Sequence, residues 1–373
     1  MKKPELLAPA GDLEKLKIAV IYGADAVYFG GEMFSLRAGA GNMSREDMSE
    51  GIAFAHERGV KCYLAINIFA HNEDIKPLEQ YLHYIKDIGI DAFIASDPGI
   101  IHMIQDIIPN AEIHLSTQAN MTNYQTANFW YKQGVSRIVL ARELTFSEII
   151  EIRNNTPSDL EFEAFVHGAM CISYSGRCLL SNFMIERDAN RGMCAHPCRW
   201  KYSLVEEQRP GQYYPVEEDE RGTYILNSRD LCMIEYIPEL IKSGISSLKI
   251  EGRMKSIFYV ATVVSAYRKA IDSYVSDPQN YQTSAYTRDY IFTGLIKSYD
   301  SESGYAIVEQ RNKMVIGDEV EVFGPGIDFF TQKIEEMYDE QGEAIDSAPH
   351  PQQILKIKIK NIVKPNFMIR KRR

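Results

Sequence analysis

Eight short runs rich in apolar and β-branched residues recur between residues 5 and 252, and an amphipathic stretch follows each of them. The runs are ELLAPA (5–10), AVYFG (26–30), CYLAIN (62–67), AFIAS (92–96), EIHLS (112–116), RIVLA (137–141), EFEAFV (161–166) and SLKIEG (247–252). This alternation is typical of repeated β-α units around a parallel sheet. We therefore predict a (β/α)8 TIM-like barrel, with a doubly wound open sheet as the alternative.

The pattern changes near SDPQNYQTS (276–284). The later segments TGLIKSYDSESGYAIVEQRNKMVIGDEVEVFGPG and QILKIKIKNIV alternate with period two and are interrupted by Gly-Asp and Gly-Pro. These features predict a small antiparallel β-barrel. We expect a catalytic barrel over residues 1–277, a cysteine-rich insertion over 168–232 after its seventh strand, and a second domain, a candidate for RNA binding, over 285–373.

Composition predicts a cytoplasmic protein. Pro4, Asp12 and Glu14 interrupt any apolar run at the N-terminus, so no signal peptide is expected, and no stretch is long enough to span a membrane. The net charge of −10 gives no general support for a nucleic-acid partner. The segment 356–373 nevertheless holds eight basic residues and no acidic one, which indicates either a lysine-protected edge strand or a phosphate-binding strip.

Five of the six cysteines follow the seventh predicted strand: Cys171, Cys178, Cys194, Cys198 and Cys232. Cysteines of reducing compartments more often hold metals than form disulfides. Four thiolates from separate loops suit either a structural zinc or an iron–sulfur cluster, and the spacing does not separate these two alternatives. The sixth cysteine, Cys62, lies within a predicted strand and is expected to be a buried apolar residue.

Polar residues follow the predicted strands where a barrel enzyme places its site. They are Glu32, Arg37, Asn67, Asp97, Ser116, Thr117, Gln118, Arg142, Glu143, His167, Arg229, Asp230, Lys249, Glu251 and Arg253. Together they predict a polar small-molecule pocket. Three polar residues, Ser116, Thr145 and Asp230, are expected to cap helices instead.

Common catalytic motifs are missing. The chain has no P-loop, no G-x-S-x-G elbow and no G-x-G-x-x-G after a strand, and HERGV (56–60) lacks the second histidine of a zinc protease. A cysteine protease would need Cys171 or a neighbouring thiol as an activated nucleophile near His167.

The segment EAFVHGAMCISYSGRCLLS (163–181) resembles the signature of peptidase family U32, the collagenase-like proteins. Its matching positions are Glu163, Phe165, Gly168, Ala169, Met170, Cys171, Gly176, Arg177, Cys178, Leu180 and Ser181. The segments ELLAPAGDLEKLKIAVIYGADAVYFGG, HLSTQANMTN, CAHPCRWKY, NSRDLC and KIEGRMKS are also similar to this family. The resemblance therefore extends over the whole predicted barrel.

This resemblance implies an enzyme that hydroxylates without molecular oxygen, using an iron–sulfur cluster. The chain is most similar to the branch that converts the wobble uridine of tRNA to 5-hydroxyuridine with prephenate as co-substrate. The implied partners are tRNA and a paralogous subunit of the family. The alternatives are hydroxylation of an rRNA base or a quinone precursor, a peptidase as the family name suggests, and a binding scaffold with a structural metal.

The resemblance also implies the site residues. A [4Fe–4S] cluster would be held by Cys171, Cys178, Cys194 and Cys232, with Cys198 as the alternative to Cys194 and zinc as the alternative cofactor. Prephenate carries two carboxylates, which arginines bind in a fork-shaped geometry. We expect Arg37, Arg142 and Arg177 in this role, and His167 and Glu251 complete the expected catalytic set.

Overall fold

The computed structural model describes residues 3–35, 43–171, 173–174, 177–187, 189, 193–199, 203–204, 211, 214–215, 218–219, 222–223, 230–276, 290–327 and 329–372. The chain divides into two compact units, Met1–Ser284 and Ala285–Arg373. Each unit has its own sheet and its own buried core. The two units are therefore described separately.

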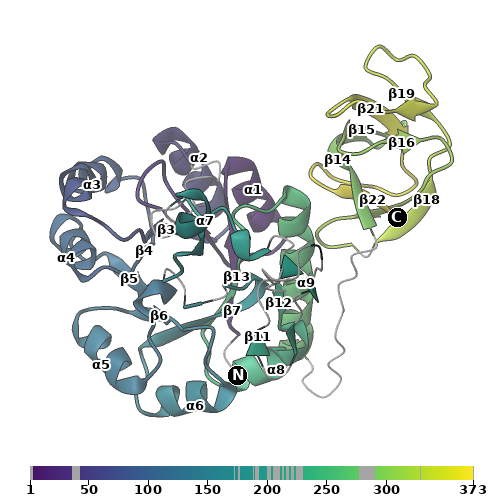
Figure 1. Cartoon of the computed structure of the whole chain (residues 1–373). Helices are drawn as coiled ribbons and strands as arrows, with labels where there is room; N and C mark the ends of the chain where they lie inside the picture. The colour runs from purple at the N-terminus through teal and green to yellow at the C-terminus, as the bar shows by residue number, and fades with distance from the viewer. Residues whose placement is uncertain are drawn as a thin grey trace. The chain divides into compact units, whose positions relative to one another are not determined.

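The first unit is a closed barrel of eight parallel strands (Figure 1). They are β1 (Glu5–Pro9), β2 (Ala26–Phe29), β3 (Lys61–Ile66), β4 (Ala92–Ala95), β5 (Glu112–Leu115), β6 (Arg137–Val139), β7 (Glu161–Ala169) and β13 (Ser247–Ile250). Pairing of β6 with β7 and of β7 with β13 closes the ring. Each predicted run forms one strand, so the barrel is confirmed and the open sheet is excluded.

Helices surround the strands (Figure 1). They are α1 (Leu13–Ile21), α2 (Arg45–His56), α3 (Asn72–Ile85), α4 (Pro98–Ile107), α5 (Tyr124–Lys132), α6 (Phe146–Asn154), α8 (Ile237–Lys242) and α9 (Ile257–Ser276). Local sequence sets their ends. The side chain of Thr145 caps α6 as predicted, and the side chain of Asp97 caps α4. After α1 and α5 the chain turns at Gly23 and Gly134, both with positive φ.

A buried ion-pair network lies inside the barrel. Arg137 Nη1 is 2.5 Å from Glu5 Oε1 and 3.5 Å from Glu163 Oε2, and Lys249 Nζ is 2.7 Å from Glu163 Oε1. The Glu163 side chain is fully buried. Burial alone would raise its pKa, but Lys249 and Arg137 hold the pKa below the usual value for glutamate. These opposite charges allow a carboxylate to lie in the barrel interior.

The insertion after β7 returns to the same strand. It contains the short helix α7 (Leu180–Ile185) and a 3-10 turn η3 (Pro197–Arg199), and it ends in β12 (Asp230–Cys232). Strand β12 pairs antiparallel to β7, with Asp230 opposite Ala169 and Cys232 opposite His167. The two ends of the insertion are thus joined by main-chain hydrogen bonds at the C-terminal end of β7.

The second unit is built on an antiparallel sheet with the strand order β18-β17-β22-β14-β15-β21-β19. These strands are β14 (Tyr290–Asp300), β15 (Tyr305–Gln310), β17 (Glu319–Phe323), β18 (Phe330–Lys333), β19 (Met337–Tyr338), β21 (Ile354–Lys358) and β22 (Met368–Arg372), and β16 (Met314–Val315) pairs with β20 (Ser347–Ala348). Leu355 and Ile357, alternate residues of β21, are buried in its core together with Ile369 of β22. The predicted antiparallel sheet is confirmed.

The basic C-terminal segment is not an edge strand. Strand β21 pairs with β15 on one side and with the two-residue β19 on the other, and β22 lies between β14 and β17. Three of its cations are ion-paired: Lys358 with Glu336, Arg370 with Glu321 and Lys371 with Asp318. The edge-strand alternative is therefore wrong.

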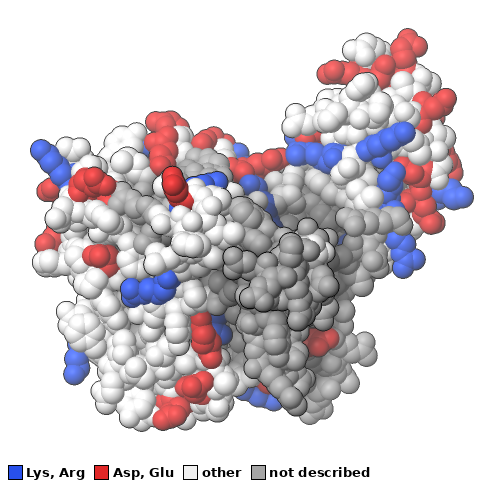
Figure 2. Space-filling model, viewed as in Figure 1, with Lys and Arg blue, Asp and Glu red and all other residues white. Residues whose placement is uncertain are grey.

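The described surface mixes both signs of charge. On the face seen in Figure 2, acidic and basic side chains are interspersed over the described residues. Among those residues no helix has both the length and the apolar character needed to cross a membrane.

Candidate active site at the mouth of the barrel

A pocket of about 100 Å³ opens at the C-terminal ends of the barrel strands. Its wall includes residues that follow five of them: Asn67 after β3, Gln118 after β5, Arg142 after β6, Cys171 after β7 and Glu251 after β13. Parallel strands in a barrel all end at the same rim, so residues far apart in sequence meet there. The predicted polar pocket is thus present at the predicted end of the barrel.

Three of the predicted thiol ligands share this pocket. Cys171, Cys178 and Cys194 line it, whereas Cys198 is not among the described lining residues. Cys232 is not among the described lining residues either; it lies on β12 beside β7, and its side chain makes a hydrogen bond with Tyr267. All are free cysteines. These soft donors suit either an iron–sulfur cluster or a zinc ion, and the residues present therefore fit the implied cofactor.

Arg142 connects the thiols to the barrel. Its guanidinium carbon lies 3.9 Å from the ring centre of Phe165, and its Nη1 donates to Cys171 Sγ at 3.7 Å. Its buried Nε has no hydrogen-bond partner among the described residues. A half-buried, oriented guanidinium with an unused donor is suited to binding an anion.

The residues after β13 form another part of the wall. Tyr28 Oη lies 3.0 Å from Ile250 O and 3.2 Å from Glu251 Oε2, and Arg253 Nη1 donates to Ser35 Oγ at 2.6 Å. A Cβ atom at Gly30 would lie 2.6 Å from Arg253 Nη1 and 2.5 Å from Ser35 Oγ. Glycine at position 30 therefore lets the main chain approach this hydrogen bond.

A cluster of hydroxyl and amide groups completes the pocket. Ser116, Thr117 and Gln118 are all at least nine-tenths buried, and Thr117 Oγ1 donates to Leu140 O at 3.3 Å. Ser116 was expected to cap a helix, but its hydroxyl donates to Gln118 Oε1. Asp230 was expected to cap as well, but it accepts from Lys255 Nζ at 3.3 Å.

Two other predicted catalytic residues, Arg37 and Arg177, are not among the described lining residues of the pocket. Arg37 is outside the described residues. Arg177 is exposed, with its guanidinium 5.3 Å from the ring centre of Phe69. Catalytic roles for both stay predictions.

His167 is turned away from the pocket by a bulge in β7. Phe165 pairs with Lys249 and His167 with Ile250, so Val166 is the extra residue. His167 consequently packs against the rings of Tyr259 and Tyr267 on α9, at 5.9 and 5.5 Å. Its predicted catalytic role is not tested by this placement.

Tyr28 and Phe165 line the pocket but were not among the predicted site residues. The signal for both was strand periodicity. Tyr28 lies two residues after the inward-facing Ala26, and Phe165 lies two residues after the inward-facing Glu163.

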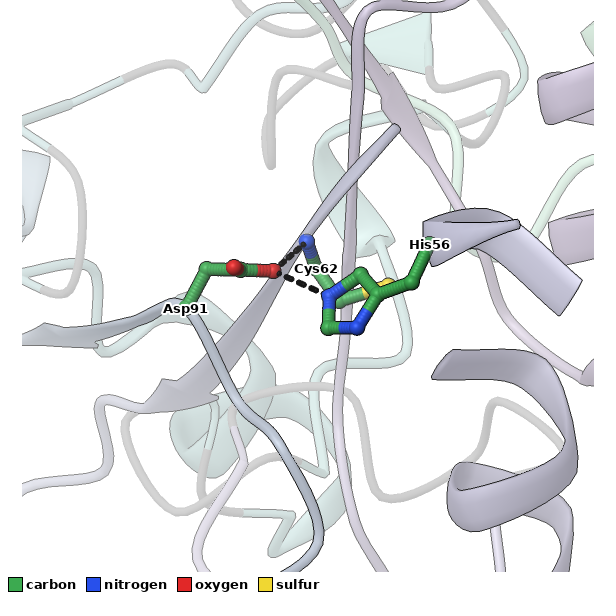
Figure 3. A group of neighbouring side chains, drawn as sticks. All are labelled: His56, Cys62 and Asp91. Carbon is green, nitrogen blue, oxygen red and sulfur yellow. Dashed lines mark hydrogen bonds and ion pairs between the residues drawn. The ribbon is translucent and has the colours of Figure 1, made fainter. Parts of the chain in front are cut away.

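A second group of potential metal ligands lies at the N-terminal ends of β3 and β4. His56, Cys62 and Asp91 have ligand atoms within 4.8 Å of one another, and no other such group is found in the described part of the chain (Figure 3). Asp91 Oδ2 is 2.8 Å from His56 Nε2 and accepts from Cys62 N at 2.7 Å. Burial raises the pKa of the Cys62 thiol to about 12. The group is therefore a structural link between α2 and two strands, and Cys62 is buried as predicted.

Comparisons with known proteins cover the whole chain. The sequence profile of peptidase family U32 matches residues 11–313, and the profile of the peptidase family U32 C-terminal domain matches residues 288–370. "tRNA hydroxylation protein P1" of Bacillus subtilis is 45% identical over 99% of this chain and 95% of that protein. "tRNA hydroxylation protein P" of Escherichia coli is 38% identical over 94% of this chain and 92% of that protein.

A relative with a different named product matches less of the chain. The "23S rRNA 5-hydroxycytidine C2501 synthase" of Escherichia coli is 36% identical over 73% of this chain and 40% of that protein. The match of the family profile to most of the chain, together with these identities over nearly full length, establishes the classification. The chain belongs to peptidase family U32.

Proposed function

We propose that the chain hydroxylates RNA, and that its product is 5-hydroxyuridine at the wobble position of tRNA. The observation that carries the proposal is the convergence of three thiols, an arginine and neutral hydrogen-bonding groups in one pocket at the mouth of the barrel. The names of the relatives from Bacillus subtilis and Escherichia coli support the same activity. In this reaction a hydroxyl group replaces the hydrogen on C5 of the base.

A [4Fe–4S] cluster would be held by Cys171, Cys178, Cys194 and Cys232, and it would supply one-electron redox chemistry next to the substrate. Because Cys194 lines the pocket and Cys198 is not among the described lining residues, we favour Cys194 as the third ligand. Zinc bonds of ~2.3 Å would bring the sulfurs within about 4 Å of one another. No three of these described thiols lie within 4.8 Å of one another, and the choice of the cluster over zinc rests on the family resemblance.

The chain's own residues would bind the two substrates. A base must leave its stack before an enzyme can act on one of its carbon atoms, so the uridine would enter the pocket unstacked. Arg142 would bind a carboxylate of prephenate with the donors that protein groups leave unused. Glu251, held by Tyr28, lines the same pocket as a candidate proton acceptor.

The second unit would contribute to RNA binding. Lys356 Nζ and Lys358 Nζ lie 4.6 and 5.6 Å from the ring centre of Tyr305. Cations beside an aromatic ring provide both phosphate attraction and a surface on which a base can stack. A paralogous subunit stays a prediction from the family resemblance.

Replacing Arg142 with lysine is expected to raise the KM for prephenate about tenfold or more while changing kcat less. Lysine keeps the charge but loses the planar fork and the stacking on Phe165. The measurement is steady-state hydroxylation of a tRNA substrate at increasing prephenate concentration. Arg58→Lys is the matched control, because Arg58 stacks on Phe54 at 3.7 Å on the outside of the barrel. An unchanged KM in the Arg142 variant would contradict this role.

The proposed function is tested by mass spectrometry of nucleosides from a strain that lacks the gene. We expect 5-hydroxyuridine and its derivatives to disappear from tRNA and to return when the gene is supplied. Nucleosides from 23S rRNA are measured in the same cells, because 5-hydroxycytidine is the product of the named rRNA relative. A strain whose tRNA nucleosides do not change would overturn the proposal, and a selective loss from rRNA would reassign the acceptor.

A further inference from the structure

Gln118 is a buried amide with one polar atom unused. The residue is 8% exposed and lines the pocket. Its Oε1 accepts hydrogen bonds from Asn67 Nδ2 at 3.4 Å and from the Ser116 hydroxyl. Its Nε2 makes no hydrogen bond among the described residues. Nε2 is not among the fully buried side-chain atoms that lack a partner, so it is reachable in the pocket and suited to a ligand that accepts a hydrogen bond.

The neighbours of Gln118 contact the oxygen of its amide. In the structure Oε1 faces the Nδ2 of Asn67 and the hydroxyl of Ser116. This arrangement leaves the NH2 group as the part of Gln118 available to a ligand.

We propose that Gln118 determines the choice of base by donating from Nε2 to O4 of uracil. This inference rests on the proposed function. O4 is bonded to the carbon next to C5, where the reaction takes place. Cytosine has an amino group at the same position, which is itself a donor and would oppose Nε2. Asn67 and Ser116 act as positioning residues, because they touch Gln118 and orient it.

The surroundings of Gln118 favour a base over a carboxylate. Asn67, Ser116 and Thr117, its neighbours in the pocket wall, are uncharged. Neutral amides are typical readers of base edges, whereas carboxylates are bound most strongly by cations such as Arg142. The two substrates would therefore contact different parts of the pocket wall.

Gln118→Glu is the discriminating variant. Glutamate keeps the shape of the side chain and an acceptor for Asn67 and Ser116, but it replaces the donor with a second acceptor. A carboxylate accepts from the amino group of cytosine, so the preference should reverse. Two RNA stem-loops that differ only in uridine or cytidine at the wobble position are compared by competition binding and by the ratio of hydroxylated products. We expect the uridine-to-cytidine ratio to fall about tenfold or more.

Gln125→Glu is the control, because it adds the same charge at an exposed position on α5. It should leave the ratio unchanged. A Gln118 variant that binds both stem-loops more weakly but keeps the wild-type ratio in binding overturns the inference, since Gln118 would then serve the co-substrate or the fold. Binding of the two stem-loops is measured under conditions in which no hydroxylation takes place. If gene loss leaves the tRNA nucleosides unchanged, the proposed function is wrong. The ratio of uridine to cytidine stem-loop binding tests the role of Gln118 separately.

Discussion

Replacing Cys171 with alanine should reduce 5-hydroxyuridine to the level of the gene-deletion strain, a loss of at least about a hundredfold. Cys171 lines the pocket and receives a hydrogen bond from Arg142, so it is both a proposed cluster ligand and a neighbour of the substrate. Loss of an outer-sphere partner of a metal already costs about 10- to 100-fold, and loss of a ligand should cost more. The measurements are iron and sulfide per chain after anaerobic purification, and tRNA nucleosides in the complemented strain.

The paired variants Cys194→Ala and Cys198→Ala sharpen this prediction. Only Cys194 is found among the described lining residues, so its removal should lower the iron content and the product, whereas Cys198→Ala should retain both. Cys62→Ala controls for the loss of a thiol at the opposite end of the barrel. One zinc and no iron per wild-type chain would contradict the cluster. Rapid alkylation of a single thiol that abolishes proteolysis would instead favour a peptidase.

Lys249→Met should lower the free energy of unfolding of the barrel by about 3–5 kcal/mol. The change leaves Glu163 fully buried and without its closest cation, which lies 2.7 Å away in the wild type. Trp130 is buried on α5, so its fluorescence in urea reports on the barrel. Lys17→Met is the matched control, because it breaks a 2.6 Å pair with Glu50 at an exposed position and should cost about 1 kcal/mol or less.

The stability lost in Lys249→Met should depend on pH in a defined direction. In the wild type the pKa of Glu163 is below its usual value of 4.5, so its contribution to stability is complete above that value and is lost as the pH falls further. Without Lys249 the pKa should rise. The deficit of the variant should then shrink as the pH is lowered toward the new pKa. A second variant, Lys249→Met with Glu163→Gln, should recover part of the loss at neutral pH, and a deficit that does not change with pH would contradict the ion-pair explanation.

The barrel could be predicted from sequence because its signal is local. Each strand is a short apolar run and each helix has its own cap or terminal glycine, as at Thr145 and Gly134. The position of the pocket followed from topology alone, since all parallel strands end at one rim. The thiols and Arg142 could therefore be assigned to the pocket before the fold was known.

The features that sequence did not predict, such as the bulge in β7, depend on contacts between residues distant in sequence. The bulge at Val166 reverses the alternation of β7 and moves His167 against two tyrosines of α9, and nothing in EFEAFVHG marks the extra residue. The hydrogen bond from Ser116 to Gln118 likewise replaces a cap that local propensity favoured. Sequence periodicity indicates which strand a residue follows, but hydrogen bonding and register decide where its side chain points.

The pairing of β7 with β12 closes the cysteine-rich insertion at its base. Its two ends meet in a three-residue ladder, so the insertion leaves and rejoins the barrel at the same strand. Doubling the length of such a loop costs only about 0.6 kcal/mol in closure entropy. Lengthening the cysteine-free part between Cys198 and Cys232 should leave both the barrel and the proposed thiol ligands in place, while the altered segment could accommodate a different RNA.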